Sequence, residues 1–149
     1  MRSSHTVAGA TGLRCGGVPT IVFTSDEAAP AAGDWLGLWF GDVPTATNKV
    51  DRVRVEYAGG TSSSGSGSCP DNSELNNDAA IRIFGAPPSE FVTNTTILAS
   101  ATNGIDRGWR SDNALIEFLP TNTFTNVTLC QQTEACEVMG ACEHVHRRL

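Results

Sequence analysis

Charged residues are scarce in this sequence. They make up 17% of its 149 residues, compared with about 25% in an average soluble domain. Sixteen acidic residues stand against ten basic ones, which gives a net charge of -6, and Lys49 is the only lysine. Nucleic-acid affinity depends on lysine and arginine side chains that neutralise phosphates. We therefore expect no nucleic-acid partner.

Long apolar runs are also missing. No stretch approaches the roughly 18 apolar residues of a membrane-spanning helix, so no membrane span is predicted. Residues 1–19 lack the continuous apolar run and the cleavage site of a signal peptide. The rest of the chain is typical of an exported protein, so we expect an extracellular or cell-surface location with the signal peptide outside this chain. A cytoplasmic protein is the alternative, which the usual compartment of cysteine-rich chains disfavours.

Helical periodicity is absent before residue 130. Val53 and Val55 instead alternate with Arg52 and Arg54, which places the two valines on one face of a strand. Runs of this strand-like kind cover residues 20–24, 35–40, 50–57, 80–84, 91–98, 114–119 and 124–129. The pattern excludes the helix–strand alternation of nucleotide-binding α/β folds and predicts an all-β protein.

Two kinds of strand recur along the chain. Residues 92–97 and 124–129 both follow the pattern apolar-Thr-Asn-x-Thr-apolar, 32 residues apart, and residues 50–55 match the first of these loosely at an offset of 42. Residues 81–84 and 116–119 form a second pair at an offset of 35. Equivalent strands separated by loops of unequal length predict the stacked coils of a solenoid. A β-sandwich, with short strands at similar spacing, is the alternative.

Three consecutive motifs carry a family resemblance. A strand ends in Phe-Thr-Ser at Ser25, Gly-Asp-Trp at 33–35 leads into an aromatic-rich strand, and another strand ends in Glu-Tyr-Ala-Gly at 56–59. This succession resembles bacterial extracellular right-handed parallel β-helix proteins of the pectate-lyase-like class. The resemblance implies a fragment of about three to four coils, but no particular activity, since this architecture carries lyases, hydrolases, adhesins and spacers.

The predicted organisation has three parts. Residues 1–17 form a poorly defined N-terminal segment, residues 18–129 form the coils, and residues 130–149 form an irregular tail that contains cysteine and histidine. The Ser- and Gly-rich residues 59–78 form a flexible loop within the coils. An open end of a solenoid exposes unpaired backbone and apolar side chains, so neighbouring coils of a longer parent chain are expected partners.

The tail contains three of the five cysteines, Cys130, Cys136 and Cys142. They are the candidates for disulfide bonds in an exported chain. Zinc could use these thiolates together with His144 and His146. The spacing C-x5-C-x5-C-x-H-x-H fits no common zinc module, so a disulfide-stapled tail is the favoured interpretation.

Acidic residues form no obvious catalytic group. Strand-borne Asp51, Glu56 and Glu117 lie near arginines, and Arg82 and Glu117 are expected at equivalent strand positions. We interpret them as solvated outer-face charges, and no catalytic residue is predicted. The loop residues Asp71, Glu74 and Asp78 offer oxygen ligands of the kind calcium prefers. Their spacing does not match a calcium-binding loop, so they are weak calcium candidates, and no other cofactor is expected.

Tryptophans are the best candidates for a binding face. Trp35 and Trp39 lie four residues apart and flank Gly37, so they are expected on one face of a strand, with Leu36 and Leu38 facing the interior. They would form an apolar platform for a glycan or a partner, to which Trp109 is added as a third candidate. Packing beneath the loop at 59–78 or against a partner is the alternative.

The sequence thus predicts a non-catalytic, extracellular or cell-surface module with a structural or adhesion-type role. A polysaccharide or cell-surface glycan is its expected ligand. The alternative is a polysaccharide lyase or glycoside hydrolase of the β-helix class, whose active site is incomplete in this chain.

Overall fold

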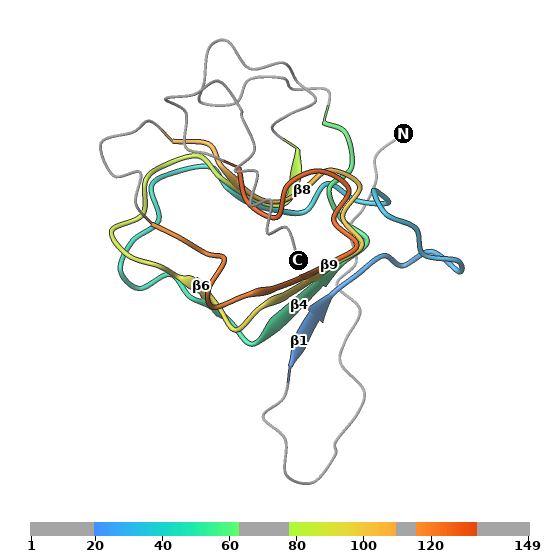
Figure 1. Ribbon diagram of the computed structural model, residues 1–149, viewed down its shortest axis with the longest axis horizontal. Coiled ribbons are helices and arrows are strands. Elements are labelled where there is room, and N and C mark those ends of the chain that lie inside the picture. The colour runs from blue at the N-terminus through green and yellow to red at the C-terminus, as the bar shows by residue number, and fades with distance from the viewer. Residues whose placement is uncertain (1–19, 63–77, 110–115, 134–149) are drawn as a thin grey trace, which may run out of the picture.

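A computed structural model describes residues 20–62, 78–109 and 116–133, and these residues form short β-strands with no helix among them (Figure 1). The strands are β1 (Ile21–Phe23), β2 (Leu38–Phe40), β3 (Val50–Asp51), β4 (Val53–Glu56), β5 (Ala79–Ile83), β6 (Val92–Thr93), β7 (Thr96–Leu98), β8 (Asn103–Arg107) and β9 (Thr123–Thr125). The all-β prediction is confirmed for the described part of the chain. The segment 1–17 and most of the tail at 130–149 lie outside it.

The strands form three sheets, in which every pair of neighbours is parallel. Sheet A has the order β1-β4-β7-β9, sheet B the order β2-β5-β8, and sheet C consists of β3 and β6. The chain visits sheets A, B and C in turn twice, then sheets A and B through β7 and β8 and sheet A again through β9. Successive passes follow nearly the same path in Figure 1. This arrangement is compatible with a parallel β-helix and differs from the antiparallel layers of a β-sandwich.

The observed register confirms one of the three predicted repeat offsets. Val50 pairs with Val92 and Arg54 with Thr96, which is the predicted offset of 42. The offset of 32 is wrong, because Phe124 lies beside Ile97, 27 residues away. The offset of 35 is also wrong, because the residue beside Ile81 is Ile105, 24 residues away, and not Ile116.

Left-handed bends explain why the offset of 32 was misleading. Asn94 has a φ of 49° and Asn126 a φ of 54°, and asparagine tolerates this conformation better than most residues. Asn94 lies in the bend from sheet C to sheet A, whereas Asn126 lies in the bend that follows sheet A. The two Thr-Asn motifs therefore look alike because both contain a bend, although the bends occupy different corners.

Each kind of bend stacks in its own column. Arg52 and Asn94 both have positive φ in the bend from sheet C to sheet A, and Tyr57, Ala99 and Asn126 do so after sheet A. Their backbone N–H groups donate to the next layer: Arg52 to Thr93, Asn94 to Thr121, Tyr57 to Leu98, and Ala99 to Thr125. Such bonds satisfy buried backbone groups at corners where a strand ladder is interrupted.

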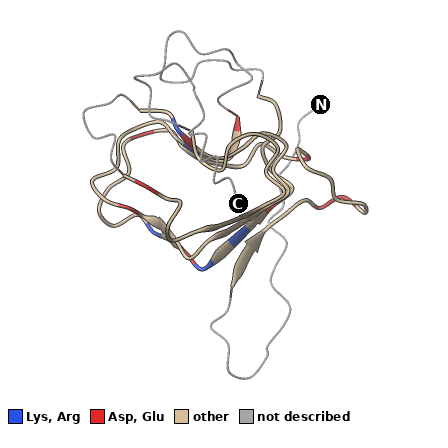
Figure 2. Ribbon diagram, in the orientation of Figure 1, with Lys and Arg blue, Asp and Glu red and all other residues tan. Residues whose placement is uncertain are grey.

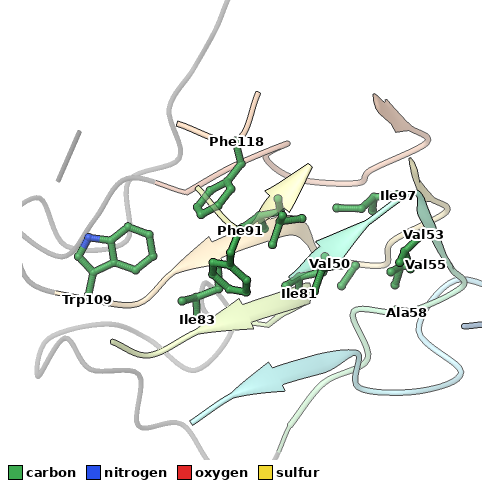
Figure 3. Close-up of a cluster of buried hydrophobic side chains, with 13 residues drawn as sticks. Val50, Val53, Val55, Ala58, Ile81, Ile83, Phe91, Ile97, Trp109 and Phe118 are labelled. Carbon is green, nitrogen blue, oxygen red and sulfur yellow. The ribbon is translucent and has the colours of Figure 1, made fainter. Parts of the chain in front are cut away.

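Apolar side chains fill the space between the sheets (Figure 3). Val55, Ile81, Ile97 and Ile105 are fully buried, and each lies beside its register neighbour from the adjacent layer. Aromatic contacts continue this stack, with the rings of Phe91 and Phe118 6.1 Å apart. Burial of apolar surface at about 25 cal/mol per Å² provides the main stabilisation of this interior.

Candidate functional site

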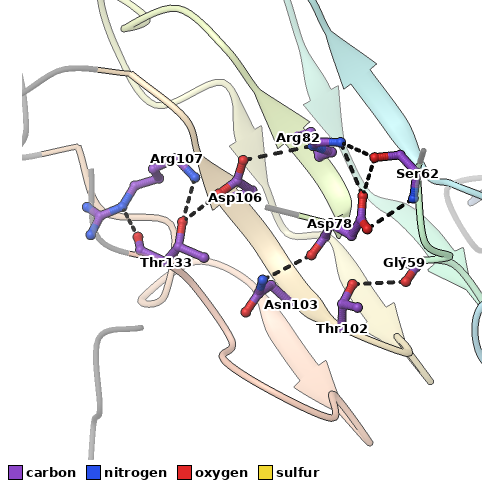
Figure 4. A network of polar contacts seen from close by, with 9 residues as sticks. All are labelled: Gly59, Ser62, Asp78, Arg82, Thr102, Asn103, Asp106, Arg107 and Thr133. Atoms are coloured by element: carbon purple, nitrogen blue, oxygen red, sulfur yellow. Dashed lines mark hydrogen bonds and ion pairs between the residues drawn. The ribbon is translucent and has the colours of Figure 1, made fainter. Parts of the chain in front are cut away.

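The outer face of sheet B carries a row of unlike side chains, Trp39 of β2, Arg82 of β5 and Asp106 of β8. The three residues are register neighbours. They point outward because side chains alternate along a strand and the adjacent Ile81 and Ile105 lie in the core. We define the Arg82 cluster as Arg82 with its polar neighbours Ser62, Asp78 and Asp106 (Figure 4).

Arg82 is the centre of this cluster and is only 1% exposed. Its guanidinium carbon lies 4.6 Å from the ring centroid of Trp39 and 5.0 Å from that of Phe84. The two rings meet edge to face with their centroids 5.9 Å apart. Trp39 remains 40% exposed. A desolvated cation–π contact contributes up to about 2 kcal/mol, so Arg82 holds one side of an otherwise accessible indole ring.

Asp78 is the nearest counter-ion of Arg82. Arg82 Nη1 donates to Asp78 Oδ1 at 3.2 Å and to Ser62 Oγ at 3.1 Å. The Ser62 backbone N–H donates to Asp78 Oδ2 at 3.0 Å, and its hydroxyl donates to Asp78 Oδ1 at 2.7 Å. Ser62 and Asp78 are the described residues on either side of 63–77. Their bonds therefore tie together the two ends of the predicted loop.

Asp106 is the least satisfied member of the cluster. Its Oδ1 accepts a hydrogen bond from Thr133 Oγ1 at 3.0 Å. Its Oδ2 lies 3.9 Å from Arg82 Nε, and neither of these two buried atoms has a hydrogen-bond partner among residues 20–62, 78–109 and 116–133. Burial raises the pKa of Asp106 to about 7, and the charge of Asp78 adds to this effect, while Thr133 and Arg82 oppose it. The Asp106 carboxyl therefore gains or loses its proton near neutral pH.

Access limits what the cluster can do chemically. Asp106 is 3% exposed and Asp78 is 1% exposed. A general acid must come within hydrogen-bond reach of its substrate. In this arrangement the two carboxyls contact protein groups, and Trp39 is the member of the row that reaches solvent. The geometry thus favours a structural role, in which the Arg82 cluster stabilises the packing of β5 against β8 beneath the exposed ring of Trp39.

A second buried arginine corrects one expectation about the charges. Glu117 does not occupy a strand position equivalent to that of Arg82. It forms an ion pair with Arg107, at a distance of 2.8 Å. Arg107 Nε also donates to the Thr133 carbonyl oxygen at 2.6 Å. The expectation is wrong for the same reason as the offset of 35, because β8 and not residues 116–119 pairs with β5.

Charges on sheets A and C differ from those of the Arg82 cluster in their exposure. Arg54 forms an ion pair with Glu56, and Arg52 lies 3.0 Å from Asp51. The two arginine side chains are 47% and 54% exposed. Figure 2 shows these few charges spread along the ribbon. They match the sequence interpretation of solvated outer-face pairs, which contribute at most about 1 kcal/mol each.

The three tryptophans do not form the predicted common platform. Trp39 points outward, but Trp35 packs against the core and its Nε1 donates to the Glu56 carbonyl oxygen at 2.8 Å. Trp109 is 2% exposed and packs edge to face on Phe118. Leu36, expected in the interior, is 36% exposed. Of the three candidates, only Trp39 is exposed, at 40%.

Gly37 causes this reversal of faces. Its φ of 116° interrupts the strand, so residues before and after it no longer share one alternation. A Cβ atom on Gly37 would lie 2.6 Å from the carbonyl oxygen of Ala79 and still closer to that of Ala80. The close approach of the β5 backbone therefore requires glycine here, both for conformation and for space.

Replacing this glycine gives a local test of the packing. Gly37→Ala is expected to lower the free energy of unfolding by about 2–5 kcal/mol, from positive-φ strain together with overpacking. Gly41→Ala is the matched control, because a Cβ on Gly41 meets no atom within 4 Å. Urea unfolding of both variants measures the difference. Equal stability of the two would contradict the close contact between Gly37 and β5.

The remaining candidates lie mostly outside the described residues. Asp71 and Glu74 do so, and Asp78 is bonded to Arg82 and Ser62. Within the described ranges, no three metal-ligating side chains are grouped, and calcium stays a prediction. Cys136 and Cys142 also lie outside the described ranges, so the disulfides with Cys130 stay a prediction as well. No helix in residues 20–62, 78–109 and 116–133 could cross a membrane.

Sequence reasoning missed the Arg82 cluster as a unit. It assigned no strand to residues 99–113, whereas both Asn103 and Asp106 belong to β8. One signal was present, since Arg82 and Asp106 are charged residues that directly follow Ile81 and Ile105. Ion pairing across β5 and β8 could be found only once their register was known.

Comparisons of the chain with family models, with curated proteins and with solved structures find no match. The fold and the Arg82 cluster are therefore the observations on which a function can rest.

Proposed function

We propose that this chain is part of a right-handed parallel β-helix of about three to four coils. The repeating order of sheets A, B and C, the parallel register and the stacked bends all support this proposal. Right-handedness is supported by general stereochemistry, because connections between parallel strands of one sheet are right-handed in about 98% of cases. A β-helix of this kind is a rigid stack, which suits it to display or support a binding face.

The proposed function is a non-catalytic structural or adhesion-type module outside the cell that contacts glycans through Trp39. The observation that carries it is the exposed Trp39 ring fixed on one side by the buried Arg82. A ring held in place loses little conformational freedom when a flat sugar face stacks on it. The low charge content and the cysteines support an exterior location.

A panel of immobilised polysaccharides tests this function. The full chain is expected to bind at least one of them, and Trp39→Ala is expected to weaken that binding by about tenfold or more, the equivalent of one lost stacking contact. Leu129→Ala is the control, because Leu129 is an apolar residue of similar exposure, at 50%, that is not a member of the Arg82 cluster. No binding to any polysaccharide, or equal binding by the Trp39→Ala variant, would contradict the proposal.

A polysaccharide lyase or glycoside hydrolase is the second candidate. Asp106 favours it, because burial raises its pKa to about 7 and the carboxyl can therefore hold a proton at neutral pH. Catalysis would require the protein around Asp106 to open toward the substrate. Assays for reducing sugars and for unsaturated products decide between the candidates. Turnover that disappears in Asp106→Asn would replace the binding function with an enzymatic one.

A further inference from the structure

At one end of the stack, the first strand of each sheet has no second strand neighbour among the described residues. β1, β2 and β3 are each the first strand in their sheet, and all three come from residues 20–51. Within the described part of the chain, each pairs on one side only. The backbone groups on the other side of each strand have no strand partner in the described ranges, so they form three neighbouring edges that can accept further parallel strands.

Inward side chains at this end are stacked on one side only. Ile21 lies beside Val53 in the register, yet Ile21 is 56% exposed and Val53 is 5% exposed. Leu38 and Phe40 are half-buried, whereas their partners in β5 are fully buried. The strands β1 and β2 thus direct apolar side chains inward as β4 and β5 do. Those of β4 and β5 are buried, whereas those of β1 and β2 remain partly exposed.

The rim of this end is acidic. Residues 20–49 contain four acidic residues and one basic residue, Lys49. The excursion between β1 and β2 carries Asp26, Glu27 and Asp34, and it projects from the stack with red segments in Figure 2. A polypeptide that covers this end would gain from basic residues on its own rim.

We propose that the edges of β1, β2 and β3 bind a further parallel coil of polypeptide, with apolar side chains facing the axis and basic residues on its rim. The inference rests on the proposed β-helix, because three edges share one end only in a stacked coil. A second copy of this chain is a poorer occupant. Its matching end repeats the same acidic rim, and Glu117 is the only charged residue among residues 116–133 at its opposite end.

Synthetic peptides are the probes for this edge. The first peptide has the sequence of residues 50–58, because residues 53–55 of this segment already form a parallel pair with β1, on the opposite edge of that strand. The second carries Asp51→Asn and Glu56→Gln and is therefore more basic. Both are expected to bind the full chain saturably in fluorescence anisotropy, and the basic peptide should bind more tightly, with the difference reduced by salt.

Two lysine variants of the full chain locate the binding edge. Ile21→Lys places a charge at an inward position of the open end and is expected to weaken peptide binding by about tenfold or more, because the charge would be buried unpaired. Leu129→Lys is the matched control, since Leu129 is similarly exposed, at 50%, and its binding should be unchanged. Leu38→Lys, at a half-buried inward position of β2 beside Ile81, is a second edge variant in case Ile21→Lys unfolds the chain.

Each outcome decides the proposal. Selective loss of binding in the edge variants supports it, whereas equal binding by all variants, or no peptide binding, overturns it. Concentration-dependent self-association without peptide would show that a second copy covers the edge, which also overturns the proposed occupant. Hydrogen exchange distinguishes an error in the proposed binding edge from an error in the proposed β-helix. Slow amide exchange in β4, β5 and β7 is expected of the β-helix whether or not a peptide binds.

Discussion

Arg82→Met is expected to lower the free energy of unfolding by about 3–5 kcal/mol, one of the largest effects in this chain. The substitution keeps an apolar stem of similar length but removes the positive charge between Asp78 and Asp106. Both carboxyls are buried, and Asp78 would lose its ion pair with Arg82. Trp39 would lose the cation on which its ring rests. Denaturant unfolding at pH 8, where Asp106 is ionised, measures the effect.

Arg54→Met is the matched control for this prediction. Arg54 also forms an ion pair on a strand, but its side chain is 47% exposed. Its removal is expected to cost at most about 1 kcal/mol, because solvent screens the remaining Glu56 charge. If the two methionine variants were equally stable, the Arg82 cluster would be solvated, and Arg82 could not hold Trp39 in place.

The second large effect is a fall in stability as the pH rises from about 4 to 7. The pKa of Asp106 is raised in the folded chain from its ordinary 3.8 to about 7. Between these values the folded state keeps a proton that the unfolded state has lost, so raising the pH favours unfolding. The difference of about three pKa units corresponds to roughly 4 kcal/mol. Unfolding curves at pH 4.5 and pH 7.5 measure it.

Asp106→Asn isolates this contribution, because the amide has no proton to lose in that range. Its stability should change little between pH 4.5 and pH 7.5, while that of the unaltered chain falls. Other shifted carboxyls act outside this window. Hydrogen bonds from Ala31 to Asp34, and from Asn94 to Asp51, lower the pKa of each carboxyl, so their contribution is lost only as the pH falls below about 4. Identical pH profiles for both proteins would contradict the burial of Asp106.

Local patterns predicted the fold class because they reflect the interior directly. Val53 and Val55 alternate with arginines, and the structure buries both valines in β4. By contrast, β8 contains one large apolar residue, Ile105, between Gly104 and Asp106. Its extended form depends on pairing with β5, which is a tertiary effect that no local pattern contains.

The candidate site was less predictable than the fold, for two physical reasons. Alternation predicted the outward direction of Trp39 but failed for Trp35, because the positive φ of Gly37 interrupts the strand between them. The pairing of Arg82 with Asp106 depends on register, and a shift of a few residues changes every cross-strand neighbour. Sequence therefore identified the exposed aromatic residue, whereas coordinates were needed to find what lies beneath it.

Methyl contacts measured by nuclear Overhauser effects test the parallel stack most directly. Side-chain methyl groups of Ile81 and Ile105 lie in adjacent layers, as do those of Val55 and Ile97, so cross-peaks within both pairs are expected. Close Hα–Hα contacts between strands are characteristic of antiparallel pairing. Observing those contacts in place of the two methyl pairs would contradict the parallel sheets, and with them the proposed β-helix on which the proposed binding function depends.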